Sequence, residues 1–358
     1  MDTEQLREDR AALQLINPAP YNAEAPPEAL AGGITPIALH YVRSNFPLPE
    51  HDGTLSIGGA VANPLTLTLE DLKAMPAHEQ AVTLECAGNG RLQMRPLPTG
   101  EPWGDYAVST SRWRGARLSD VLAMAQPAEG GVEVLLTGAD HGAYHLTPVL
   151  ADIDREDLRF ERALPLPLAA DPASDILIAY EMNDEPLPVD HGAPFRLIVP
   201  RWYAVTSVKW LARIDVLTDP FSGEFQTGHY MYEWPDRPPE RVDIMRVRAR
   251  ITSPAPEAVI PAGPCLVRGK AWAGRGPIQR VEVSLTGAGE WYPADLHPPT
   301  GPYQWQEWTF EWDASDVGRH TLRVRATDSA GNVQPEVPEW NRLGYGNNAV
   351  EVIYVDVV

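Results

Sequence analysis

Short apolar runs separated by glycine, proline and acidic turn residues make up most of this sequence. In the first two thirds, these runs predict buried strands at Leu55–Ile57, Val82–Leu84, Val132–Thr137, Ile176–Met182, Phe195–Val199 and Ile214–Leu217. Apolar residues at helical spacing, or start signals for a helix, predict short helices near Glu4–Leu13, within Leu65–Met75 and within Trp113–Leu122. The mixture of strands, short helices and loops predicts an α+β domain over residues 1–247.

Two stretches of this domain are expected to lack regular pairing. Residues 1–34 are rich in proline and alanine, and we expect them to wrap the surface as an extended arm. Gly138–Gly142 is expected to be a loop that presents polar groups at the end of a strand.

From about Val247 onward the pattern changes to evenly spaced strands without helix signals. In Val281–Leu285, apolar residues alternate with Glu282 and Ser284, as on a strand with one buried face. Four further strands are predicted at Leu266–Ala271, Trp308–Trp312, Thr321–Ala326 and Val350–Val357. Regular spacing with period-two alternation predicts an all-β, immunoglobulin-like sandwich over residues 248–358.

Composition and charge narrow the possible partners. The 358 residues include 49 acidic and 29 basic side chains, a net charge of −20, which argues against nucleic acid or anionic lipid as the main partner. Apolar runs stay well short of the ~20 residues that span a membrane. The acidic N-terminus resembles neither a secretory signal nor a twin-arginine leader. We therefore expect a cytoplasmic protein, or a periplasmic one if a leader has been removed.

The sequence contains two cysteines, Cys86 and Cys265. Cys86 follows the strand Val82–Leu84 closely and precedes the turn-prone Ala87-Gly88-Asn89-Gly90, with Arg91 five positions later. Because a nearby guanidinium favours the thiolate, this thiol is expected to lose its proton easily and to act as a nucleophile or a soft-metal ligand. Cys265 is expected to be a buried small side chain, since a single disulfide would be unusual in so large a chain.

The residue pattern alone leaves the role of Cys86 open, and a buried structural thiol remains an alternative. A papain-like nucleophile requires a histidine base; His141, His191 and His229 are present but lie in no known local signature. Zinc-site spacings such as CxxC or HExxH, the P-loop and the dinucleotide fingerprint are absent from the sequence.

Several motifs taken together resemble the sulfite oxidase family of molybdenum enzymes, in an order and at separations similar to the family's. They are Val42-Arg43-Ser44-Asn45, Leu84-Glu85-Cys86-Ala87-Gly88-Asn89 with Arg91, Asp190-His191-Gly192 with Arg196, and Ser207-Val208-Lys209-Trp210-Leu211. The resemblance extends from about residue 35 to the end. It implies a mixed α/β molybdopterin-binding domain of the sulfite oxidase fold, followed by an immunoglobulin-like dimerisation domain and hence a homodimer.

The resemblance also implies roles for individual residues. Cys86 corresponds to the thiolate that binds molybdenum beside the pterin dithiolene, and a soft sulfur ligand suits such a metal. The residues that correspond to the family's cofactor-binding groups are Tyr41, Val42, Arg43, Ser44, Asn45, Asp140, His191, Arg196, Ser207, Val208 and Lys209. Those that correspond to its anion pocket are Arg43, Arg91, Trp103, Tyr230 and Arg342, with Arg342 reaching in from the second domain.

Three departures from the family pattern bear on function. Gly90 stands where vertebrate members carry a further arginine, and His229 precedes Tyr230 where an acidic residue is common. A cytochrome b5-like segment is also missing from this sequence, so we expect no heme and an external electron acceptor, either cytochrome c or oxygen.

The predicted activity is therefore the molybdenum-dependent oxidation of sulfite to sulfate. One alternative is a nitrate reductase-like or sulfoxide-reducing enzyme of the same fold, although the superfamily's sulfoxide reductases typically lack the second domain. Another is a metal-free protein that uses the immunoglobulin-like module for adhesion.

Overall fold

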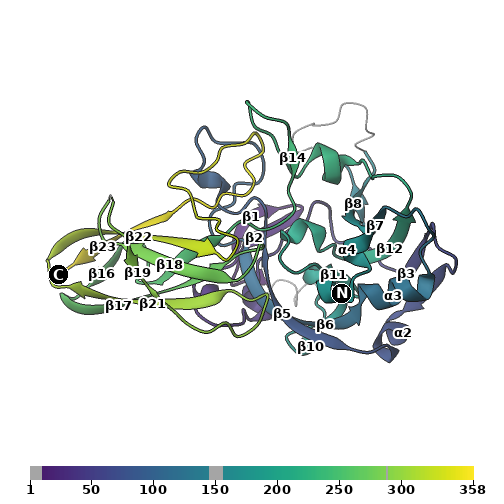
Figure 1. The fold of residues 1–358 in the computed structure, drawn as a ribbon, viewed down its shortest axis with the longest axis horizontal. Helices are drawn as coiled ribbons and strands as arrows, with labels where there is room; N and C mark the ends of the chain where they lie inside the picture. The colour runs from purple at the N-terminus through teal and green to yellow at the C-terminus, as the bar shows by residue number, and fades with distance from the viewer. Residues whose placement is uncertain (1–9, 145–155, 288) are drawn as a thin grey trace.

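The computed structural model describes residues 10–144, 156–287 and 289–358. Figure 1 shows an elongated molecule in which a strand-rich C-terminal part projects from a larger N-terminal part of strands, short helices and loops. Each part has its own main hydrophobic core, and a smaller buried cluster in the N-terminal part includes Val82, Leu84 and Trp113. The predicted architecture, an α+β domain followed by a β-sandwich, is confirmed, although helices are few. None of the described helices is long and apolar enough to cross a membrane.

Two five-stranded sheets form the N-terminal part. One sheet is antiparallel, with the order β10-β9-β6-β5 and with β11 also paired to β9; its strands are β5 (His78–Glu85), β6 (Val108–Arg117), β9 (Leu177–Met182), β10 (Glu185–Pro186) and β11 (Arg196–Ile198). The other has the order β4-β3-β12-β7-β8, with β3 and β12 parallel; its strands are β3 (Thr54–Gly59), β4 (Leu65–Thr68), β7 (Glu133–Gly142), β8 (Leu158–Pro165) and β12 (Leu211–Leu217).

Short helices follow the strands of these sheets. Thr68 begins α2 (Leu69–Ala74) with a capping box: its hydroxyl accepts from the backbone N–H of Asp71, whose carboxylate accepts from the N–H of Thr68. The other α-helices in the described residues are α3 (Leu118–Ala125) and α4 (Leu166–Ala169). The segment Trp113–Leu122 is thus helical only from Leu118, because its first residues belong to β6.

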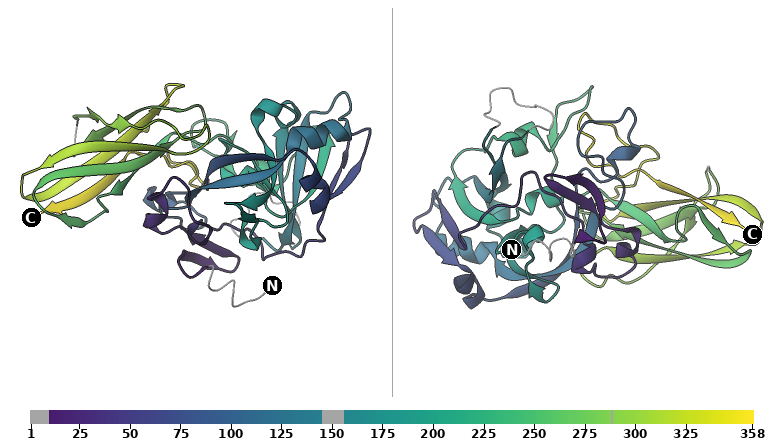
Figure 2. Two further views of the ribbon diagram at one scale, coloured as in Figure 1. Left: turned by 90° about the horizontal axis from the view of Figure 1, so that it is seen from below. Right: turned by 180° about the vertical axis from the view of Figure 1, so that it is seen from behind.

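The start of the chain is more regular than predicted. Instead of an unpaired extended arm, β1 (Gln14–Pro18) and β2 (Tyr21–Glu24) form an antiparallel hairpin, which lies near the junction of the two parts (Figures 1 and 2). Most of the predicted helix Glu4–Leu13 lies outside the described residues; Arg10 is helical, and a turn follows at Ala11 and Ala12.

The C-terminal part is the predicted sandwich of two sheets. A four-stranded sheet, β15-β17-β21-β20, contains β15 (Arg248–Ser253), β17 (Gly263–Trp272), β21 (Gln306–Ala314) and β20 (Asp295–Leu296). The five-stranded sheet β16-β23-β22-β18-β19 contains β16 (Ala258–Ile260), β23 (Glu351–Val357), β22 (Gly318–Asp328), β18 (Ile278–Ser284) and β19 (Tyr292–Pro293). A small ribbon in the connection between the parts consists of β13 (Met231–Tyr232) and β14 (Glu240–Arg241).

Cys265 is only partly buried, contrary to expectation. It lies near the start of β17, opposite Trp312 on β21, where the sandwich core covers it incompletely.

Candidate active site

Cys86 is the residue that follows β5, and its backbone N–H donates to the carbonyl of Ala107, 2.9 Å away. Gly90 has a left-handed φ of +80° and turns the chain toward Arg91. A Cβ atom at this position would lie 2.8 Å from Nδ2 of Asn347. The left-handed φ disfavours a larger side chain here, and the Asn347 side chain would have to shift to admit one. We call residues 86–91 the cysteine loop.

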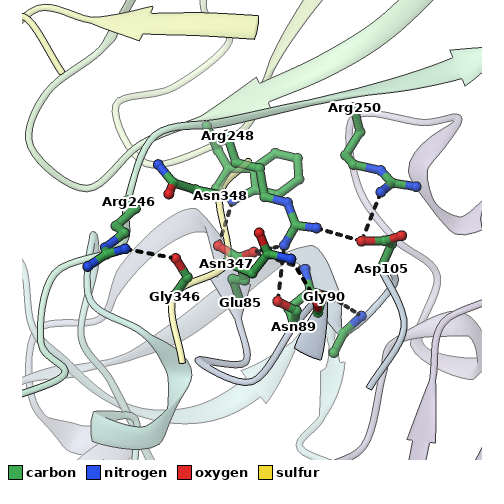
Figure 3. A network of polar contacts seen from close by, with 12 residues as sticks. Glu85, Asn89, Gly90, Asp105, Arg246, Arg248, Arg250, Gly346, Asn347 and Asn348 are labelled. Atoms are coloured by element: carbon green, nitrogen blue, oxygen red, sulfur yellow. Dashed lines mark hydrogen bonds and ion pairs between the residues drawn. The ribbon is translucent and has the colours of Figure 1, made fainter. Parts of the chain in front are cut away.

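A buried ionic network holds the cysteine loop against the sandwich (Figure 3). The carboxylate of Glu85 accepts from Asn89 Nδ2, Arg248 Nη1 and Trp272 Nε1, each at 2.9 Å. Arg248 also donates through Nη2 to Asp105 at 2.7 Å. Since Arg248 and Trp272 belong to the sandwich, the second domain helps to fix the residue next to Cys86.

Residues 341–348 of the C-terminal part form a second set of hydrogen bonds to the cysteine loop. Gly346 N–H donates to the carbonyl of Ala87 at 2.8 Å, and Asn347 Nδ2 donates to that of Gly90 at 2.7 Å. Figure 3 shows Asn347 beside Gly90. The cysteine loop is thus held from both sides by residues distant in sequence.

The structure brings most of the predicted cofactor-binding residues into one cavity, which we call the large cavity. The space inside it and at its open mouth together amounts to about 630 Å³. Its lining includes Tyr41, Arg43, Ser44, Asn45, Cys86, Asp140, His191, Arg196, Ser207 and Lys209. Val42 and Val208 are buried beside it and contribute backbone bonds, to Ala23 and Leu197 respectively.

Asp140 enters the large cavity because β7 is irregular. The predicted loop Gly138–Gly142 is part of this strand, but its pairing with β8 shifts register between Thr137 and His141. Such a bulge re-aims a side chain that regular pairing would direct elsewhere. Burial raises the pKa of Asp140 to about 7.

Among the cations of the large cavity, Arg196 is buried and Lys209 is half-buried. Lys209 Nζ donates to the hydroxyl of Ser44 and to the carbonyl of Asp190, each at 2.9 Å. Burial, followed by repulsion from Arg196, lowers the pKa of Lys209 to about 7, and burial lowers that of Arg196 to about 10. A bound anion would offset these costs, because it favours the charged forms of both groups.

His40 was not predicted, yet it lines the large cavity 4.8 Å from the ring of His191. Burial lowers its pKa to about 3, from an ordinary value near 6.5. Between these pH values the unfolded chain binds more protons than the folded one, so stability falls as the pH decreases, by up to roughly 1.4 kcal/mol per unit for this group.

We expect urea unfolding of the cofactor-free protein to show this loss of stability between about pH 6.5 and pH 3. His40→Phe should weaken it, whereas His297→Gln, at a partly exposed site, should not; equal slopes would contradict the assignment.

A second, smaller cavity of about 390 Å³ adjoins the first. Arg43, Cys86 and Tyr230 line both cavities, and Arg91 and Trp103 line only the small one. Arg91 donates through Nε to the carbonyl of Leu343 at 2.9 Å and through Nη1 to that of Glu101 at 2.7 Å. Cys86 therefore lies between the large cavity and a small one that two arginines line.

Tyr230 reaches the small cavity through an unusual backbone conformation. Its φ is +59°, a left-handed value that is unfavourable for a bulky side chain. Strain of this kind persists where surrounding contacts hold the residue, often at functional sites. The ring of Tyr230 stacks on that of Tyr345, with centroids 5.1 Å apart.

Arg342 does not reach either cavity within the part of the chain that the structure describes. Its guanidinium donates to both carboxylate oxygens of Glu233, at 2.7 and 2.6 Å, and its backbone N–H donates to the carbonyl of Glu233. The second domain instead supplies Leu343 and Tyr345 to the small cavity. The expected role of Arg342 in binding the anion has no geometric support here.

Two family models cover most of the chain. Residues 45–225 match the oxidoreductase molybdopterin binding domain, and residues 240–357 match the Mo-co oxidoreductase dimerisation domain. The chain belongs to the sulfite oxidase family. The predicted boundary between residues 247 and 248 stays a prediction, as the second match already begins at residue 240.

Relatives within the sulfite oxidase family differ in their named activities. Mitochondrial sulfite oxidase of Mus musculus is 34% identical over 97% of this chain, and the alignment covers 66% of the mouse protein. Inducible nitrate reductase [NADH] 2 of Glycine max is 32% identical over 96% of this chain and 42% of its own length. The crystal structure of the sulfane dehydrogenase SoxCD from Paracoccus pantotrophus superposes with a TM-score of 0.83 at 27% identity, covering 99% of this chain and 90% of the other.

The large cavity fits the molybdopterin that this family's domain binds. Cys86 supplies the one sulfur ligand among its lining residues, and Arg196 and Lys209 supply positive charge for a phosphate. In the described residues, the Tyr41 hydroxyl, Arg196 Nε and Asp140 Oδ1 have no hydrogen-bond partner although they are buried. Buried polar groups normally have partners, so a polar ligand at this place would satisfy them.

The thiol of Cys86 is less acidic than the sequence suggested. Burial raises its pKa above 9.0, and the attraction of Arg43 lowers it only in part, with Arg91 a weaker influence. The prediction of an easily lost proton is therefore wrong for the metal-free protein. Deprotonation then has to accompany metal binding, as is usual for cysteine ligands.

The lining residues of the small cavity that escaped sequence analysis include Glu101, Tyr144 and Tyr345. Glu101 and Tyr144 belong to no recognisable motif. Tyr345 lies between Gly344 and Gly346, which have φ values of +66° and +64°. An aromatic residue between two glycines is a turn signal that could have singled it out.

Proposed function

We propose that this chain oxidises sulfite to sulfate and passes two electrons to an external acceptor such as cytochrome c. The supporting observation is that Cys86, Arg43 and Tyr230 form the shared wall of the two cavities. A molybdenum cofactor held in the large cavity would accept two electrons at this wall. The balanced reaction is SO3²⁻ + H2O → SO4²⁻ + 2 H⁺ + 2 e⁻.

The residues of the small cavity have separate tasks in this proposal. Arg43 and Arg91 attract and orient the anion, since guanidinium groups bind oxyanions through charge-assisted hydrogen bonds. Their bonds to protein carbonyls fix both groups before substrate arrives, which avoids reorganisation during the reaction. The Tyr230 hydroxyl donates to a substrate oxygen, and Trp103, which is 1% exposed, closes one wall against water.

Assays of purified protein with measured molybdenum content test the proposal. Protein with molybdenum near one per chain should reduce ferricyanide when sulfite is added. The similarity to nitrate reductase supports a second candidate, nitrate reduction, which should appear as oxidation of a reduced dye by nitrate. Absence of sulfite turnover by metal-loaded protein would remove the first candidate.

Arg91→Gln is expected to raise the KM for sulfite at least about tenfold, with a smaller change in kcat, because a hydrogen bond to a charged group is worth about 1.5–3 kcal/mol. Steady-state kinetics at equal molybdenum content measures this effect. Arg95→Gln is the matched control: Arg95 also donates to two carbonyls, of Leu92 and Met94, but is exposed and lines neither cavity. An unchanged KM in Arg91→Gln would refute the role of Arg91.

The remaining proposals concern assembly and location. The match to a dimerisation domain supports a homodimer, which light scattering of the purified protein would test. A cytoplasmic location stays a prediction.

A further inference from the structure

The small cavity has only a modest surplus of positive charge. Glu101 lines the cavity together with Arg43 and Arg91; its buried carboxylate attracts Arg43 and accepts from Asn17 Nδ2 at 3.1 Å. His229 also lines the cavity, and its ring nitrogen is 2.8 Å from the buried carboxylate of Glu224, which offsets positive charge on the imidazole. These side chains leave a surplus of about one positive charge.

Several N–H groups of the Arg43 and Arg91 guanidiniums already donate hydrogen bonds to other residues of the protein. Arg43 donates through Nη1 to Asn22 Oδ1 at 3.3 Å and to the carbonyl of Ser44, and through Nη2 to Asn45 Oδ1 at 2.6 Å. Arg91 uses Nε and Nη1 for carbonyls, as described above. Few donors remain for a substrate with three charged oxygens, and Arg342 is held by Glu233.

Aromatic rings occupy much of the remaining wall. Tyr345 from the second domain stacks on Tyr230 at an interplanar angle of 21°, and Trp103 and Tyr144 also line the cavity. Such surfaces repel additional negative charge at their faces but favour apolar groups. Each methylene that leaves water against them can strengthen binding by up to roughly fourfold.

We propose that the small cavity also takes small organic sulfinates, R–SO2⁻, and oxidises them to sulfonates. A sulfinate has a single negative charge for the arginines, a sulfur lone pair, and an apolar substituent for the aromatic wall. The reaction is R–SO2⁻ + H2O → R–SO3⁻ + 2 H⁺ + 2 e⁻. An S–O bond forms with oxygen from water, and the two electrons reduce two equivalents of the same one-electron acceptor that is used with sulfite. This inference rests on the proposed function, because it uses the same cavity and cofactor.

The direct test compares methanesulfinate with sulfite, using ferricyanide as acceptor above neutral pH, where sulfite is a dianion. We expect kcat/KM for methanesulfinate above about one hundredth of the value for sulfite, a margin of roughly 3 kcal/mol in transition-state binding. A lower ratio with active sulfite turnover overturns the inference alone. If neither substrate is oxidised by molybdenum-loaded protein, the proposed function fails as well.

Two variants test whether the low positive charge and the aromatic wall cause this selectivity. The quantity compared is the ratio of kcat/KM for methanesulfinate to kcat/KM for sulfite, in which differences in cofactor content cancel. Glu101→Gln keeps an acceptor for Asn17 but removes the negative charge, and should shift the ratio toward sulfite by roughly tenfold. Tyr345→Val removes the ring, and should lower kcat/KM for methanesulfinate at least fivefold more than for sulfite, by loss of apolar contact on the order of a methylene or two. Tyr354→Val, at a position on β23 that is 44% exposed and outside the cavity, should leave the ratio unchanged. Unchanged ratios in both cavity variants would overturn the explanation.

Binding without turnover supplies an independent measurement. The products are a methanesulfonate monoanion and a sulfate dianion, and a ligand that binds only the folded protein raises its unfolding temperature in proportion to ln(1 + [L]/Kd). Because sulfate also stabilises folded proteins generally by exclusion from their surface, the comparison uses low millimolar ligand at equal ionic strength, where methanesulfonate should stabilise the protein more than sulfate does. A larger effect of sulfate contradicts the proposed selectivity.

Discussion

Cys86→Ser is expected to abolish the thiolate-to-molybdenum absorption band and to lower kcat with sulfite by more than about 100-fold, since even changes behind a metal ligand commonly cost 10–100-fold. Serine nearly matches cysteine in size, and the backbone bond of Cys86 to Ala107 is unaffected. Unfolding should therefore change by only about 1 kcal/mol. Loss of the band and of activity without loss of the fold would assign the sulfur to the metal.

Cys265→Ser provides the matched control for this experiment. Cys265 is the other cysteine of the chain and lies on β17 in the sandwich, remote from both cavities. It should leave the visible spectrum, molybdenum content and kcat unchanged. If Cys86→Ser also keeps the band and normal turnover, Cys86 is not the metal ligand and the proposed mechanism loses its basis.

The fold could be predicted where the information is local. The alternation in Val281–Leu285 predicts a strand because one face of it is buried, and the structure places Ile278–Ser284 in the sandwich accordingly. Thr68 and Asp71 signal a helix start through bonds between residues three positions apart. By contrast, the bulge in β7 and the β1–β2 hairpin depend on pairing with partners that sequence periodicity does not reveal.

The residues of the candidate site were likewise predictable where they belong to local sequence motifs, and not where long-range contacts place them. Residues in recognisable motifs, such as Arg43 and Lys209, meet in the large cavity as expected. Tyr345 was missed and Arg342 was misplaced, because both belong to a loop whose course is set by contacts with the cysteine loop and Glu233. The acidity of Cys86 was overestimated for a related reason: a nearby guanidinium is visible in sequence, but the burial that opposes it is not.

The same loop contacts imply that the second domain is part of the active site, and Arg248→Met should show this. Arg248 has 4% of its side chain exposed and bridges Glu85 to Asp105. Its removal leaves the buried Glu85 carboxylate with neutral donors alone, from Asn89 and Trp272. Breaking a buried ion pair in this way costs about 3–5 kcal/mol. We expect a loss of unfolding free energy near the lower end of this range, because Asp105 still has an ion pair with Arg250, at 3.0 Å.

Urea unfolding of the cofactor-free protein measures this loss. Arg319→Met is the control: its ion pairs with Glu257 and Asp356 are on the surface of the sandwich, where such pairs contribute about 0–1 kcal/mol. If the pairing itself is responsible, Glu85→Gln combined with Arg248→Met should cost less than the sum of the two single changes, since Gln leaves no buried charge unpaired. Additive effects, or a loss as small as that of Arg319→Met, would contradict the coupling.

The effect of Arg248→Met on catalysis separates positioning from simple destabilisation. Because Arg248 also lies 3.4 Å from the carbonyl of Asn89, its loss should loosen the cysteine loop and displace Arg91 at the end of it. Molybdenum content should fall, and the metal-loaded fraction should show a raised KM for sulfite with a smaller change in kcat. Arg248→Lys restores a charge but not the two-pronged contact, so it should recover stability more than KM. A variant that is destabilised yet binds metal and sulfite normally would confine Arg248 to holding the two domains together.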